Sequence, residues 1–216
     1  MAYTSFHDRL RGPITEAVQK DLGIKNVNAA PRITKVTVNV GINKSKMDSK
    51  ETREYIDQML RLITGQKPVF TKARVAISNF KTRQGMIVGA KVTLRGKNME
   101  HFLDRLISFS IPRIRDFRGL PKKLDGKGNY SIGLRDHSIF PEVPAPDAGQ
   151  IFNMQIVITT TAKNDEEGMA LMKNIGMPFK RNEAQDAKDA QAAKEEAKKV
   201  ASNDDTTDTT DSQSQS

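Results

Sequence analysis

Residues 32–42 read RITKVTVNVGI, and from Lys35 onward apolar and polar side chains alternate. Successive side chains of a β-strand point to opposite faces, so this alternation predicts a strand with one buried face and one polar face. The apolar set is Val36, Val38, Val40 and Ile42. The polar set is Lys35, Thr37 and Asn39.

Two further segments with this alternation lie in an acid-free part of the chain. No Asp or Glu occurs between Gln58 and Met99, although this stretch contains nine Lys or Arg residues. Segments 69–78 and 86–95 are predicted as strands joined by the connection 79–85. Their apolar sides are expected to be Val69, Ala73, Val75 and Ile77, and Met86, Val88, Ala90, Val92 and Leu94. Their other sides carry Lys72, Arg74 and Ser78, and Lys91, Thr93 and Arg95. A basic strand surface without acids is suited to a polyphosphate.

Four segments have the spacing of amphipathic helices. They are approximately 4–22 with a start or kink at Pro13, 50–64 with Asp48 or Ser49 as N-cap and Gly65 as C-cap, 98–110 capped by Asn98, and 165–175 ending at Gly176. Alternating residues predict two more strands, at 129–135 and 152–161. The central order is therefore β-α-β-β-α-β, which is typical of split β-α-β units.

This order predicts an α+β protein with a mainly antiparallel sheet in a split β-α-β (ferredoxin-like) arrangement, with its helices on one face. The helices would cover the apolar side of the sheet. The uncovered side would then present six polar residues together. These are Lys35, Thr37, Asn39, Lys91, Thr93 and Arg95.

The charge of the 216-residue chain is unevenly distributed, although its total is +9. Residues 183–216 contain four basic and nine acidic residues, and residues 1–182 contain the other 31 basic and 17 acidic ones, which gives net charges of −5 and +14. The acidic segment is too poor in apolar residues to fold alone. We therefore expect one α+β domain over 1–182 and a disordered acidic extension over 183–216.

Composition excludes several classes of protein. The chain has no Cys, so disulfides, Cys-ligated zinc and a thiol nucleophile are absent. Residues 1–22 do not resemble a signal peptide, and no apolar run approaches the length of a membrane span, so a membrane partner is not expected. The absence of Trp argues against extensive stacking on bases as the main mode of binding.

No catalytic site is predicted. His7, His101 and His137 lie far apart and match no metal-ligand spacing. The cluster 165–167 opens a predicted helix, where carboxylates favour the positive end of the dipole. Segment 126–129, GKGN, lacks the spacing of a phosphate-binding loop and predicts a turn. We expect no catalytic residue, metal or cofactor. The basic face favours nucleic-acid binding, with RNA ahead of DNA, while an RNA-modifying enzyme and a DNA-binding protein remain alternatives.

Several runs resemble the family of bacterial large-subunit ribosomal protein five, which carries 5S ribosomal RNA into the central protuberance. They include PRIRDFRGL at 112–120, GAKVTLRG at 89–96 and GQKP at 65–68, with further runs at 31–41, 71–74, 80–81, 83–85, 128–131, 139–142, 156–162 and 165–168. The resemblance covers approximately residues 5–181. It implies a structural, cytoplasmic ribosomal protein and not an enzyme.

The resemblance also implies sites and partners. Family residues that meet 5S rRNA match Asn39, Gln66, Thr93 and Arg95 here, three of which belong to the polar sheet face. The full rRNA-binding set that we expect is Arg32, Lys35, Asn39, Gln66, Lys67, Lys91, Thr93 and Arg95. The loop expected to face P-site tRNA contributes Arg74, Ser78, Asn79, Lys81 and Arg83. Other implied partners are 23S rRNA, neighbouring proteins of the central protuberance, and small-subunit ribosomal protein thirteen, which would be contacted near 138–150.

The sequence departs from the family pattern at three places. The run VAISN at 75–79 differs from the usual tRNA-facing sequence, so contacts there would use the backbone or Lys81 and Arg83. The segment PAPDAG at 144–149 is also unusual. The family normally ends near 179–181, so the acidic tail is an extension.

Overall fold

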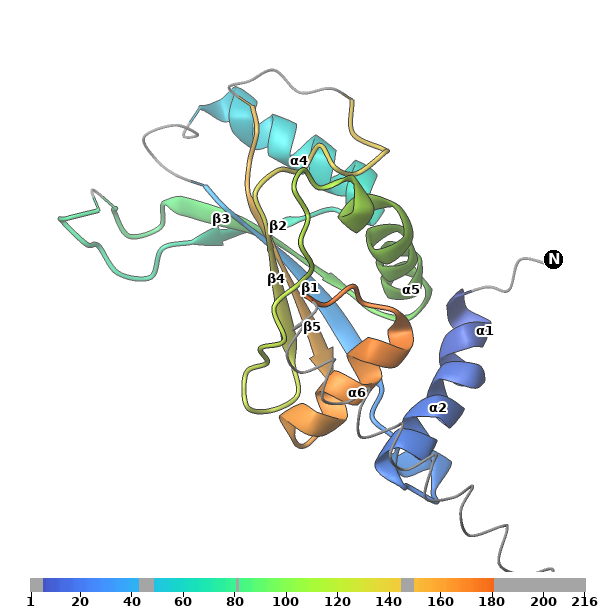
Figure 1. The fold of residues 1–216 in the computed structure, drawn as a ribbon. Helices are drawn as coiled ribbons and strands as arrows, with labels where there is room; N and C mark the ends of the chain where they lie inside the picture. The colour runs from blue at the N-terminus through green and yellow to red at the C-terminus, as the bar shows by residue number, and fades with distance from the viewer. Residues whose placement is uncertain (1–5, 43–48, 81, 145–149, 181–216) are drawn as a thin grey trace, which may run out of the picture. The chain divides into compact units, whose positions relative to one another are not determined.

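The computed structural model describes residues 6–42, 49–80, 82–144 and 150–180. Its centre is an antiparallel sheet of five strands in the order β2-β3-β1-β5-β4 (Figure 1). The strands are β1 Ile33–Gly41, β2 Val69–Lys72, β3 Ile87–Leu94, β4 Tyr130–Leu134 and β5 Met154–Thr160. The predicted tail, 183–216, lies outside the described residues.

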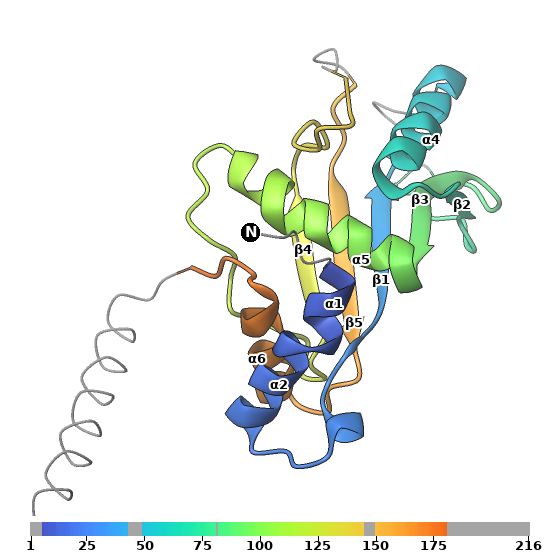
Figure 2. The same cartoon turned by 90° about the vertical axis from the view of Figure 1, so that its right-hand side faces the viewer.

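The helices are α1 Phe6–Arg11, α2 Pro13–Leu22, α4 Lys50–Thr64, α5 Gly96–Arg105 and α6 Asp165–Ile175. Short turns of helix add η1 Val27–Ala29, the π-helical η2 Leu106–Ser110 and η3 Ile111–Arg113. Figure 2 shows α1, α5 and α6 in front of the strands, so the helices cover one face of the sheet. The α+β prediction is therefore confirmed.

Strand directions explain how the split β-α-β unit forms. β3 pairs antiparallel with both β1 and β2, so β1 and β2 run in the same direction with β3 between them. α4 connects β1 to β2, which is the expected split unit. β5 also pairs antiparallel with β1 and completes the four-strand pattern. β4 is an additional edge strand beside β5.

Most predicted ends of the helices are confirmed by their capping geometry. The Ser49 hydroxyl accepts a hydrogen bond from the backbone N–H of Thr52 at 3.1 Å, as an N-cap does. Gly65 ends α4 in the left-handed conformation at φ 68°. Pro13 begins α2 after a break at Gly12. The predicted cap at Asn98 was wrong, because the extended residue Arg95 precedes the helix and α5 begins at Gly96.

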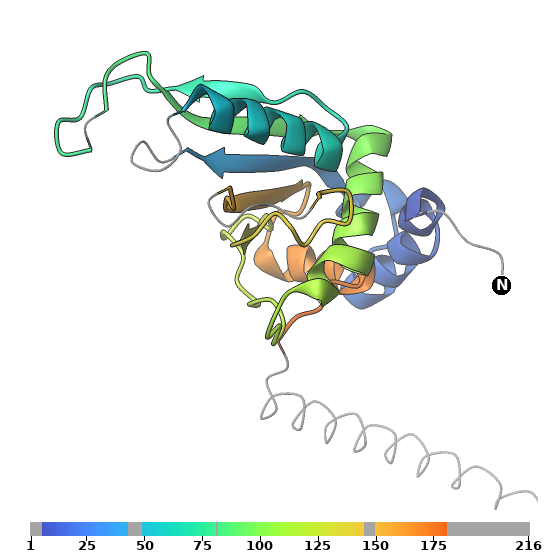
Figure 3. The same cartoon turned by 90° about the horizontal axis from the view of Figure 1, so that it is seen from above.

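The predicted strand over 69–78 was too long, and its apolar side faces solvent. β2 ends at Lys72, and the chain continues as a hairpin that projects beyond the sheet (Figure 3). Within the described part of the chain, no helix lies over this hairpin. Its apolar side chains therefore find no core, and Val75 is 68% exposed. Val69, Ile77 and Val88, which were expected to be buried, are exposed as well.

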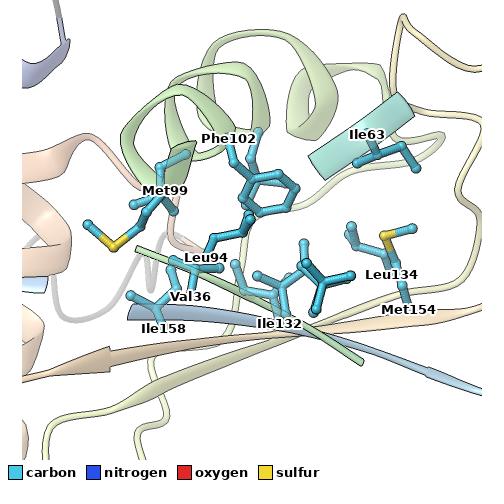
Figure 4. Packing of buried hydrophobic residues seen from close by; sticks show 14 of the residues in the cluster. Val36, Ile63, Leu94, Met99, Phe102, Ile132, Leu134, Met154 and Ile158 are labelled. Carbon is cyan, nitrogen blue, oxygen red and sulfur yellow. The ribbon is translucent and has the colours of Figure 1, made fainter. Parts of the chain in front are cut away.

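The core lies between the sheet and the helices. Phe102 of α5 and Ile63 of α4 point toward the strands, where Val36 and Ile158 come from β1 and β5 (Figure 4). All four side chains are fully buried. Truncating such a buried Phe to Ala typically costs about 3–5 kcal/mol. This packing fixes which side of the sheet remains open.

A buried histidine holds the segment after β4 against α4. His137 stacks on Phe152 at 3.9 Å between ring centroids, and the Tyr55 hydroxyl lies 3.1 Å from its Nε2. The backbone N–H of Phe152 lies 3.5 Å from Nδ1 and donates to it. Burial lowers the pKa of His137 below its ordinary value of 6.5, and the charge of Asp136 opposes this only in part.

The His137 environment predicts a loss of stability in mild acid. Below pH 6.5 the unfolded chain takes up a proton that the folded chain does not, so the free energy of unfolding should fall as pH falls. The slope should reach at most about 1.4 kcal/mol per pH unit. Urea denaturation between pH 7 and 5 should show this fall in the native protein. His137→Gln should remove that part of the slope, whereas the exposed His101→Gln should retain it; equal slopes in all three proteins would contradict the assignment.

Candidate nucleic-acid interface

The uncovered face of the sheet brings the expected polar residues together. Asn39 of β1 pairs with Lys91 of β3, and Thr37 pairs with Thr93. Val36, Val38 and Val40 are buried on the opposite face, so alternation places these pairs on the open side. Lys35 and Arg95 extend the same side at the strand ends, because Arg95 is still in extended conformation.

β5 and β4 add residues that the sequence analysis did not assign to the interface. Gln155 lies between Asn39 and Gly133 in the cross-strand row, and Val157 lies between Thr37 and Ser131. The alternation of the two predicted strands could have identified these positions. That these positions continue the open surface of β1 is shown only by the order of the strands in the sheet, which depends on which strands pair.

The open face carries positive charges and no negative ones. None of the five strands contains Asp or Glu, whereas Lys35, Lys72 and Lys91 lie within them. No salt bridge joins these lysines to any carboxylate in the described part of the chain. The face therefore offers positive charge and neutral hydrogen-bonding groups, with no fixed negative charge inside it.

The remaining expected rRNA residues lie at the margins of this face. Gln66 and Lys67 are exposed in the connection between α4 and β2, which leads to Val69, the cross-strand partner of Lys91. Arg32 precedes β1, is exposed, and donates from its guanidinium to the carbonyl oxygen of Asn28 at 3.3 Å. The whole expected set therefore falls on the sheet or on connections that lead into it.

A hollow of about 780 Å³ lies at the end of the open face where β1 and β4 end and β3 and β5 begin. Glycines form part of its floor: Gly41 pairs with Gly89, and Gly133 lies on the far side beside Gln155. A Cβ on Gly41 or Gly133 would meet no atom within 4 Å, whereas one on Gly89 would lie 2.8 Å from the carbonyl oxygen of Val40. No side chain covers the exposed backbone at Gly41 and Gly133, whereas Gly89 is buried and tightly packed.

The expected tRNA-facing residues lie on the projecting hairpin. Its arms are held by paired backbone hydrogen bonds of 3.1 Å between Ile77 and Thr82. Phe80, at the tip, is 75% exposed. Four of the five expected residues, Arg74, Ser78, Asn79 and Arg83, are exposed here. Lys81 lies outside the described residues.

The turn at 126–129 is already occupied by a carboxylate of the chain itself. The backbone N–H groups of Gly126 and Gly128 donate to the two oxygens of Asp165 at 3.1 and 3.0 Å. Because Asp165 already takes these backbone N–H groups, the GKGN turn does not offer them to a phosphate as a phosphate-binding loop would. The predicted turn at 126–129 is confirmed. The predicted position of the acidic cluster 165–167 at the start of a helix is confirmed as well, since Asp165 lies in the first turn of α6.

The three histidines lie apart in separate structural roles. His7 Nδ1 is 2.8 Å from Glu100 Oε2, His101 is exposed, and His137 is buried in its aromatic cluster. Among the described residues, no three His, Asp or Glu side chains are placed to hold a metal ion. Nor does that part of the chain contain a helix long and apolar enough to cross a membrane.

The segment expected to meet a small-subunit protein is only partly described. Residues 145–149 lie outside the described residues. Phe140 is buried and stacks on Phe102, and Glu142 forms a salt bridge with Arg105. These contacts attach the near end of the segment to α5.

The fold and the open face define a class of α+β protein with a basic, carboxylate-free sheet surface. Two family models match the chain. One, described as ribosomal protein L5, matches residues 26–83, and the other, which describes the C-terminus of the same ribosomal family, matches residues 87–179.

Curated proteins that are similar to this chain carry the description of the same ribosomal protein. Large ribosomal subunit protein uL5 of Acaryochloris marina is 51% identical over 166 residues, covering 76% of this chain and 91% of the relative. The protein of the same description from Natranaerobius thermophilus is 47% identical, covering 80% of this chain and 96% of the relative. The chain therefore belongs to the ribosomal protein L5 family.

The glycine floor predicts a position-specific cost of adding one methyl group. Gly89→Ala should lower the free energy of unfolding by roughly 1–3 kcal/mol, because its Cβ meets the backbone carbonyl of Val40 and the sheet must shift. Gly41→Ala, the cross-strand neighbour with open space, should leave stability unchanged or slightly raised. Chemical denaturation measures both. Equal effects of the two substitutions would show that the close approach at Gly89 is relieved without cost.

Proposed function

We propose that the open face of the sheet binds 5S rRNA and thereby helps to attach it in the central protuberance. Family membership makes the chain a structural component of the large ribosomal subunit and not an enzyme. The cytoplasmic, ribosomal location expected from the sequence is confirmed on the same ground. The observation that carries the proposal is the absence of any carboxylate from five adjacent strands whose uncovered side bears Lys35, Lys91 and Arg95.

The chemistry of the face suits an RNA backbone. Arg95 can donate two parallel hydrogen bonds to phosphate oxygens, while lysine supplies charge without fixed geometry. Asn39 and Thr93 can bond ribose hydroxyls, which distinguish RNA from DNA. The row from Lys91 through Asn39 to Gln155 places such groups about 5 Å apart, the spacing of neighbouring strands.

Substitution of the face should weaken 5S rRNA binding without unfolding the protein. Arg95→Ala and Asn39→Ala should each raise Kd several-fold, because they remove contacts from exposed or half-buried side chains outside the core. Arg95→Ala should also reduce the slope of log K against log salt by about one, the effect of losing one phosphate contact. Filter binding at several salt concentrations measures both quantities.

Two controls define this test. Lys50→Ala removes one exposed charge at the start of α4, away from the strands, and should leave Kd unchanged. Removal of residues 183–216 should also have no effect, since we propose that this acidic extension is disordered and avoids phosphates. If both face variants bind as tightly as the native protein at every salt concentration, 5S rRNA does not use this face.

We further propose that the projecting hairpin contacts P-site tRNA. Exposed Arg74 and Arg83 on its arms supply charge, and its distance from the core leaves it free to reach a partner beyond the rRNA surface. We propose that a separate segment, 138–150, contacts small-subunit ribosomal protein thirteen. We assign 23S rRNA and the neighbouring proteins of the central protuberance as the other partners.

The hairpin assignment predicts a selective defect. In ribosomes assembled with Arg74→Ala/Arg83→Ala protein, P-site tRNA should dissociate several-fold faster, while 5S rRNA content and subunit association stay normal. Subunit association is the matched control because we place the intersubunit contact in another segment. Unchanged tRNA dissociation would exclude a contribution of these side chains, and lost 5S rRNA would show that they belong to the rRNA surface.

A further inference from the structure

We infer that the exposed segment Arg113–Lys127 is a second phosphate-binding surface, which holds the backbone of an RNA molecule other than the one on the sheet face. We call this segment the basic edge loop. It runs from the end of η3 to the turn before β4, and Figure 2 shows it passing along the β4 side of the sheet toward α6. The inference rests on the rRNA-binding function proposed above.

The loop carries six exposed basic side chains: Arg113, Arg115, Arg118, Lys122, Lys123 and Lys127. In the described part of the chain, none of them forms a salt bridge. Two arginines elsewhere do form salt bridges, Arg61 with Asp57 at 2.6 Å and Arg105 with Glu142. An unneutralised cluster repels itself, so its charge is best explained by an anionic partner.

The two acids of the loop, Asp116 and Asp125, offset only part of the charge of its six basic residues. Asp125 is engaged with its own turn, where it accepts from the backbone N–H of Lys127 at 2.9 Å and from the side chain of Asn129 at 2.7 Å. The side-chain bond from Asn129 is the main cause that lowers the pKa of Asp125. Asp116 is exposed and adopts φ 52°.

The loop backbone is fixed although it contains no regular structure. The N–H of Leu120 donates to the carbonyl of Pro178 at 2.8 Å, and the hydroxyl of buried Tyr130 donates to the carbonyl of Pro121 at 2.6 Å. Gly128 lies against Gly168 of α6, where an added Cβ would approach within 2.7 Å. A fixed backbone presents its charges with less entropy to lose on binding than a mobile tail would.

Uncharged strands separate this loop from the basic part of the sheet face. Lys35, Lys91 and Arg95 belong to β1 and β3 or their ends, whereas the residues of β5 and β4 on the open side are neutral. The one basic residue at the end of β4, Arg135, lines the hollow at the end of the sheet away from the loop. Basic residues occur again beyond β4, in the basic edge loop. Two basic surfaces divided by two neutral strands fit two RNA backbones better than a single continuous track.

The test compares two triple variants with the same change in net charge. One replaces Lys122, Lys123 and Lys127 by Gln in the loop, and the control replaces the exposed Lys20, Lys25 and Lys50 by Gln. Each protein is bound to 5S rRNA, and the complex is then titrated with a 23S rRNA transcript. The loop triple should bind 5S rRNA within about twofold of the native protein but capture 23S rRNA roughly tenfold more weakly, with a shallower salt dependence. The control triple should resemble the native protein in both.

The outcomes separate this inference from the proposed function. Unchanged 23S capture by the loop triple overturns the inference, and so does a parallel loss of 5S affinity, because the loop would then belong to the 5S surface. If the native protein fails to bind 5S rRNA, the proposed function is wrong. Direct titration of the free proteins with 23S rRNA then decides the inference: selective loss in the loop triple supports it, and equal binding overturns it.

Discussion

The structure depends on the two-sided character of β1. Its valines are buried under α4 and α5, and its intervening Lys35, Thr37 and Asn39 are left on the other side. Because β1 is hydrogen-bonded to both β3 and β5, its orientation fixes theirs. A shift of one residue in either pairing would reverse every side chain of the shifted strand, so the core and the open face are specified together.

Local sequence patterns predicted the helices and strands well wherever their apolar side chains are buried in the core. The β1 strand, the Ser49 and Gly65 caps and the end of α6 at Gly176 followed from alternation and capping chemistry. The same reasoning failed beyond Lys72, because alternation in 73–78 resembles that of a half-buried strand although nothing in the described part of the chain covers it. Periodicity reports which side chains share a side, and only tertiary structure decides whether that side is buried.

Features of the interface that depend on long-range pairing were not predictable. The order of β5 and β4, the glycine floor of the hollow and the filling of the 126–129 turn by Asp165 each join residues far apart in sequence. By contrast, Lys91, Thr93 and Arg95 could be placed beside Asn39, because the acid-free stretch and the β1 alternation indicated a common polar face. The family resemblance extended this set to Gln66 and Lys67, which lie outside regular strands.

The short edge strands have a consequence for the protein before it meets RNA. An exposed strand edge presents unpaired backbone groups that can recruit another chain and start aggregation. Here β2 ends after four residues at Lys72 and its chain then leaves the sheet, while β4 is five residues long and carries Gly133 in its second half. Neither edge offers a long, flat template. A newly made chain that has not yet bound RNA should therefore have little tendency to aggregate by pairing its edge strands with those of a second copy.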